Sequence, residues 1–145
     1  SIDHVDGLGI DNDRFRFIPV ALWNETGTLR LFEPENPEHV SHSALNLQHT
    51  DAFIDVRSTT FDDLVAGLGD ERVDLLKMDI EGAELVVLPD VLKSDLCPPV
   101  ICVEFDAWRP VKRLRSLVRT ALGHGFRIVV VEGRNVTFQR NHGLS

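Results

Sequence analysis

Lys77-Met78-Asp79-Ile80-Glu81-Gly82-Ala83-Glu84 is the stretch that decides the fold of this 145-residue chain. It closes an apolar run that begins at Val73, and Gly82 breaks that run before a helical pattern begins. A short apolar strand followed by a crossover helix is typical of a parallel sheet covered on both faces. The stretch therefore predicts an α/β fold with this strand near its centre.

Three ionisable side chains follow one another at the end of this strand. Side chains alternate across a strand, so Lys77, Asp79 and Glu81 are expected to point to the same side. Unpaired charges are costly to bury, so such a row favours an open crevice, which in open α/β sheets lies at the carboxyl ends of the strands. A solvated strand end in which the lysine and the aspartate simply pair explains the spacing equally well.

Four segments together resemble the FkbM-type family of S-adenosylmethionine-dependent methyltransferases. In that family a D-x-L-K-x-D-x-E-G-x-E run closes the fourth strand of a Rossmann-like sheet, and residues 74–84 carry the same letters. The other three segments are residues 19–27 (the family's A-L-x-x-x-x-G), 56–64 (V-x-x-x-T-L-D-D-L, with Phe61 for Leu) and 100–105 (a strand with an internal Glu). The resemblance implies a Rossmann-like class I methyltransferase sheet that ends in an antiparallel hairpin.

The resemblance also implies a cofactor, a reaction and residue roles. The cofactor is S-adenosylmethionine, and the acceptor is a hydroxyl of a small molecule or sugar. Asp79 would face the reaction centre and the cofactor, Glu81 would accept a hydrogen bond from a substrate hydroxyl or the cofactor ammonium, and Lys77 would be their electrostatic partner. Ala21 and Leu22 would lie near the adenine.

One part of the family pattern is not found in the sequence. Such families hold the cofactor through a Gly-rich turn after the first strand, and the first G-x-G here is Gly7-Leu8-Gly9, which follows a segment too polar for a central strand. We interpret it as a loop. The sequence therefore predicts a single, N-terminally truncated methyltransferase domain over residues 1–145, and leaves open whether this chain is an active enzyme.

Two alternatives change the class of protein. The chain could be a catalytically incomplete fragment that acts as a binding or assembly module. It could also be a divalent-metal-dependent hydrolase, because Asp79, Glu81, Glu84 and Glu104 offer the oxygen ligands that hard cations prefer. No metal site is predicted under the methyltransferase interpretation.

Two of these glutamates have structural interpretations. Glu84 opens a helix, where the macrodipole favours a carboxylate. Glu104 lies inside an apolar strand, so it is expected to accept from loop amides near Gly82 or to pair with Lys77 on the adjacent strand.

Composition narrows the range of partners. The net charge of −8 argues against binding to nucleic acid or an anionic membrane. No apolar stretch approaches the ~20 residues of a membrane span, and no signal-peptide pattern opens the chain, so a cytoplasmic location is expected. A small-molecule substrate is the expected partner.

The flank of the strand before Asp79 would lack its neighbours in a truncated sheet, so a homodimer through this exposed sheet edge is also expected.

The remaining pattern predicts alternating strands and helices. Residues 1–14 are a polar leader, and residues 33–55 are a long polar loop that could act as a substrate lid. Thr60 is expected to cap a helix that ends at Gly69. Further elements are strands at 15–23, 28–32 and 100–105, helices after Gly82 and after Pro110, and a hairpin of 126–132 with 136–139.

Overall fold

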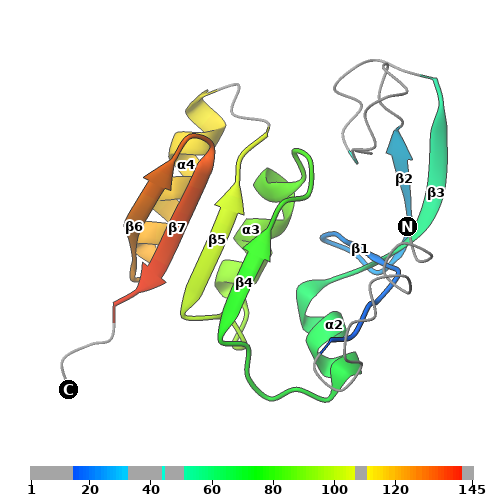
Figure 1. Ribbon diagram of the computed structural model, residues 1–145, viewed down its shortest axis with the longest axis horizontal. Helices are drawn as coiled ribbons and strands as arrows, with labels where there is room; N and C mark the ends of the chain where they lie inside the picture. The colour runs from blue at the N-terminus through cyan, green and yellow to red at the C-terminus, as the bar shows by residue number, and fades with distance from the viewer. Residues whose placement is uncertain (1–14, 33–43, 45–50, 107–110, 142–145) are drawn as a thin grey trace.

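A computed structural model describes residues 15–32, 44, 51–106 and 111–141. Within these ranges the chain is a mixed α/β protein with two sheets and three helices (Figure 1). The elements in chain order are β1 (Ala21–Leu22), β2 (Gly27–Phe32), β3 (Phe53–Thr59), α2 (Phe61–Leu68), β4 (Leu75–Met78), α3 (Glu84–Lys93), β5 (Val100–Glu104), α4 (Val111–Gly123), β6 (Phe126–Glu132) and β7 (Asn135–Arg140).

The smaller sheet has the strand order β1-β3-β2 and corrects two predictions. β3 begins at Phe53, so the predicted loop of residues 33–55 was wrong over its last three residues. These three residues pair antiparallel with residues 30–32 of β2. The predicted strand of residues 15–23 shrinks to Ala21–Leu22, which pair in parallel with Ser58 and Thr59. Pro19 lacks the N–H that a ladder needs, and the strand starts only after it.

The larger sheet has the order β4-β5-β7-β6, with β4 and β5 parallel and the other pairs antiparallel. The predicted terminal hairpin is confirmed, and Gly133 supplies the positive φ of 58° in its turn. In Figure 1, α3 and α4 both lie behind this sheet. The crossover from β4 through α3 to β5 therefore places the two strand ends side by side, as the Lys77–Glu84 stretch predicted.

The core lies between this sheet and its helices. Met78, Ile101, Val103 and Phe138 are almost fully buried, and they pack in one cluster with the apolar residues of α3, which are Val87, Leu88, Val91 and Leu92. The two-residue period of a strand sends Lys77 to the other face, where it lies in register with Cys102. The charged residues at the end of β4 are thus excluded from the core.

α2 is capped as predicted. The Thr60 side chain accepts a hydrogen bond from the Asp63 amide at 3.1 Å, and Gly69 ends the helix with a φ of 75°. The Thr60 amide donates to Thr26 Oγ1 at 3.3 Å, and that hydroxyl in turn donates to the Asp63 carboxylate. Thr26 therefore ties the start of α2 to the smaller sheet.

Some predictions concern residues outside the described ranges. These are the polar leader of residues 1–14, its Gly7-Leu8-Gly9 loop, and the predicted loop of residues 33–55 apart from residue 44 and residues 51–55. Among the described helices, none combines the length and apolar character needed to cross a membrane.

Candidate active site

The predicted catalytic residues lie at the end of β4 and in the segment that follows it. Lys77 is in the strand, and its ammonium nitrogen lies 3.9 Å from Asp79 Oδ2 and 4.0 Å from Glu104 Oε2. The Lys77 and Asp79 side chains are about half exposed, at 47% and 51%, whereas Glu104 is more buried. The contact with Lys77 confirms one of the two partners expected for Glu104, across the β4–β5 pair.

Glu84 shapes the turn that carries Glu81. It is the first residue of α3 and is completely buried, and its Oε1 accepts hydrogen bonds from the amides of Gly82 at 3.1 Å and Ile80 at 3.2 Å. The loop amides near Gly82 thus donate hydrogen bonds to Glu84 and not to Glu104. The turn holds Glu81 at a φ of 52°, a left-handed conformation uncommon for a residue with a side chain.

Burial makes Glu84 an unusual carboxyl group. Within the described residues its Oε2 has no hydrogen-bond partner. Desolvation raises the pKa of Glu84, the backbone amides act in the opposite direction, and the nearby Asp106 carboxylate raises it further. Glu84 therefore holds the turn in place and does not offer a ligand atom to solvent.

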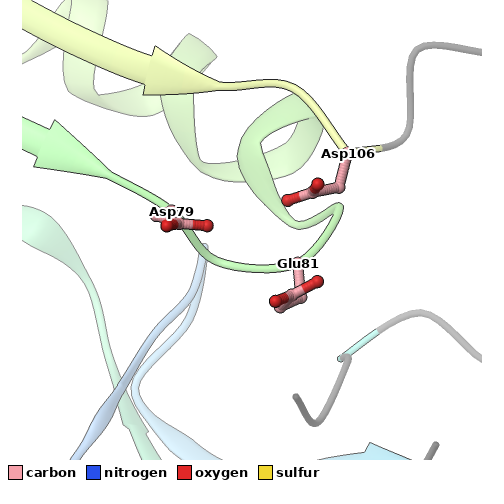
Figure 2. A group of neighbouring side chains, drawn as sticks. All are labelled: Asp79, Glu81 and Asp106. Carbon is pink, nitrogen blue, oxygen red and sulfur yellow. The ribbon is translucent and has the colours of Figure 1, made fainter. Parts of the chain in front are cut away.

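Asp106 completes the site, and the sequence reasoning missed it. It follows β5 just as Asp79 follows β4, and the carboxyl ends of neighbouring parallel strands meet at one edge of a sheet. The position of Asp106 directly after a parallel strand was the sequence signal that could have identified it. In Figure 2 the side chains of Asp79, Glu81 and Asp106 converge from these two strand ends.

Among the described residues, Asp79, Glu81 and Asp106 each offer a carboxylate oxygen, and these oxygens lie within 4.8 Å of one another. We call these three residues the acidic cluster. Oxygen atoms at this separation could hold a hard divalent cation, although exposed acidic groups commonly occur without one. The cluster differs from the metal-ligand set weighed from the sequence, because Asp106 replaces Glu84 and Glu104.

Arg134 supplies the second cation of the site. It lies in the β6–β7 turn, where its guanidinium contacts Asp106 Oδ1 and, at 3.1 Å, Glu104 Oε1. Burial raises the pKa of Asp106, the Arg134 guanidinium opposes that effect, and the carboxylates of Glu81, Glu104 and Asp79 add to it. Among the described residues, five carboxyl groups, counting Glu84, thus face two cations, which makes this edge of the sheet a favourable place for positive charge.

The predicted adenine-side residues lie in β1. Leu22 is partly buried and packs against the core. Ile80, the residue after Asp79 in the sequence, packs against the same core. In Figure 2 the blue ribbon of this part of the chain approaches Asp79 from below. The arrangement brings β1 towards the end of β4, whereas the contacts of Ala21 and Leu22 with a cofactor stay a prediction.

A cavity of about 320 Å³ lies elsewhere, between the segment before β1, β3 and α2. Its lining includes Arg16, Arg57 and Leu64, and none of the predicted site residues. We place the candidate active site at the acidic cluster, because the groups able to move protons or hold a cation gather there.

Comparison with protein families defines the class of the chain. Residues 4–128 match the model of the methyltransferase FkbM domain, so the protein is of the methyltransferase class. The match covers most of the chain, and the chain belongs to the FkbM methyltransferase family. Comparisons with curated proteins and with solved structures found no significant match.

Proposed function

We propose that this chain carries out S-adenosylmethionine-dependent methyl transfer to a hydroxyl group of a small molecule or sugar. The observation that carries the proposal is the acidic cluster at the adjoining ends of β4 and β5, in a chain of this family. The order β4-β5-β7-β6 with its terminal hairpin also supports a Rossmann-like class I methyltransferase sheet.

The residues present fit a cationic cofactor. The acidic cluster has an excess of negative charge, and Asp79 is exposed enough to receive a ligand. When bound, S-adenosylmethionine supplies an electrophilic methyl group on its sulfonium. Asp79 and Glu81 would hold the cofactor's ammonium or hydroxyl groups, and Ala21 and Leu22 would contact its adenine.

The protein's own contribution is to place the acceptor and take its proton. Alignment of reacting groups contributes most to a displacement of this kind. An Asp79 carboxylate oxygen would accept the proton of the acceptor hydroxyl, with Lys77 at 3.9 Å fixing the orientation of that carboxylate. Glu81 would accept a second hydrogen bond from the substrate.

Asp106 extends this set. Arg134 holds Asp106 Oδ1, while Asp106 Oδ2 is buried and has no hydrogen-bond partner within the described residues. Arg134 thus fixes the orientation of the Asp106 carboxyl group beside Asp79 and Glu81, where Asp106 would add to the polar surface that meets the cofactor or substrate.

Calorimetric titration with S-adenosylhomocysteine tests the proposal and separates it from its alternatives. Saturable binding at one site, without added metal, is the expected result. Binding that appears only with a divalent cation would favour the metal-dependent hydrolase, which would use the same acidic cluster. No binding under either condition would leave the binding or assembly module as the better function.

A further inference from the structure

The outer strand of the larger sheet, β6, exposes an unusually apolar edge. It lies at the end of the order β4-β5-β7-β6, so one side of it has no partner strand in the described part of the chain (Figure 1). Four consecutive aliphatic side chains on it are 40%, 41%, 50% and 64% exposed, namely Ile128, Val129, Val130 and Val131. Native proteins rarely leave such a strand edge open, because its free N–H and C=O groups invite pairing.

The two ends of this apolar run carry opposite charges. Arg127 precedes it and Glu132 follows it. Arg127 donates to the neutral Gln139 side chain at 2.8 Å, and among the described residues neither Arg127 nor Glu132 has an ion-pair partner. Charged residues at a sheet edge commonly block association. Here the two charges have opposite signs and flank the apolar run at its two ends, so two antiparallel copies of the strand would bring unlike charges together.

The pairing of β6 with β7 shows which face each side chain occupies. Arg127 and Glu132 lie opposite Gln139 and Asn135. Ile128 and Val131 lie opposite Phe138 and Val136, which belong to the core. A register shift between Ile128 and Val130 keeps Arg127 and Glu132 on the same face despite their odd spacing.

We propose that β6 pairs antiparallel with β6 of a second copy of this chain, around a twofold axis between Val129 and Val130. In this register Arg127 lies opposite Glu132 of the partner subunit, and Ile128 lies opposite Val131 of the partner subunit. Each pair then shares one face of the joined sheet, as cross-strand neighbours must. The two four-stranded sheets become one continuous sheet, and the isologous contact closes without further growth.

β6 is better suited to this contact than β4, the opposite edge of the same sheet. β6 has seven residues and β4 has four, of which Lys77 is engaged with the acidic cluster. Exposed Leu122 of α4, the helix packed against β6, adds apolar surface near this edge. The homodimer predicted from the sequence is thus assigned to β6 and not to the strand before Asp79.

Light scattering on the full chain, over a range of micromolar concentrations, tests the proposal. We expect a mass twice that of the 16.3-kDa chain at the higher concentrations. Arg127→Glu places like charges opposite each other at both ends of the interface and should weaken the dimer about tenfold or more. The double change Arg127→Glu with Glu132→Arg restores opposite charges and should restore the dimer.

Leu75→Lys on β4 is the matched control, because it places a charge on the other edge of the sheet and should leave the dimer unchanged. Circular dichroism of each variant checks that the fold is kept. A monomer at all concentrations would overturn the proposal. Dissociation of the dimer by Leu75→Lys would also overturn it, because the contact would then lie at β4. A double variant that is as monomeric as Arg127→Glu would overturn the proposed register.

Discussion

Glu84 offers the sharpest test of how the turn after β4 is held. Replacing it by alanine removes the acceptor of the Gly82 and Ile80 amides, at 3.1 and 3.2 Å. An amide left without its partner in a buried position costs about 1–3 kcal/mol. Removing a buried carboxylate offsets part of that cost, so Glu84→Ala should lower the free energy of unfolding by about 2–4 kcal/mol.

Glu84→Gln separates the hydrogen bonds from the charge. Its amide oxygen can still accept from both amides, so at neutral pH this variant should stay within about 1 kcal/mol of the wild type. The pKa of Glu84 is raised in the folded state, so the folded chain binds more protons than the unfolded chain above the ordinary value of 4.5. Wild-type stability therefore falls as pH rises through this window, and Glu84→Gln should gain relative to the wild type over the same range.

Urea denaturation at several pH values measures both effects. Glu71→Ala is the matched control, because Glu71 is exposed and its loss should change stability by less than about 0.5 kcal/mol. The reasoning is refuted if Glu84→Ala is as stable as Glu71→Ala. It is also refuted if the difference between Glu84→Gln and the wild type does not change with pH.

Four further variants test other parts of the structure. Arg134→Ala removes the cation that opposes the burial of Asp106, so the pKa of Asp106 should rise further; an NMR titration with an unchanged midpoint would contradict this. Thr60→Ala should destabilise the chain by about 1 kcal/mol in urea, because the Asp63 amide loses its capping acceptor. Gly69→Ala should also destabilise it by about 1 kcal/mol, since Gly69 has a φ of 75°. Gly67→Ala, inside the same helix and facing open space, should instead stabilise it by about 0.5–1 kcal/mol; equal effects at the two glycines would be the contrary result.

Local chemistry made much of the fold predictable. Thr60, Gly69 and the β6–β7 hairpin act through contacts close in sequence, and all three were predicted correctly. β3 was partly missed because its first residues are exposed and follow a long polar segment, and pairing with β2 decides their conformation. Pairing between distant segments leaves a weak periodic signal in the sequence.

Part of the geometry of the site could also be predicted. Lys77 and Asp79 are two residues apart, and their pairing follows from strand alternation. Asp106 and Arg134 reach the same edge only because β5 pairs with β4 on one side and with β7 on the other. The role of Glu84 was also missed, since the macrodipole explained its position without requiring that it accept from the turn amides.

The affinity of S-adenosylhomocysteine for Asp79→Asn and Asp74→Asn, compared by calorimetry, tests the assignment of the acidic cluster most directly. Both variants lose one carboxylate, but Asp79 belongs to the cluster, whereas Asp74 precedes β4 and pairs with Arg72. We predict that Asp79→Asn weakens binding at least about tenfold, or about 1.4 kcal/mol, and that Asp74→Asn binds as the wild type does. Equal affinities for the two variants would contradict the assignment.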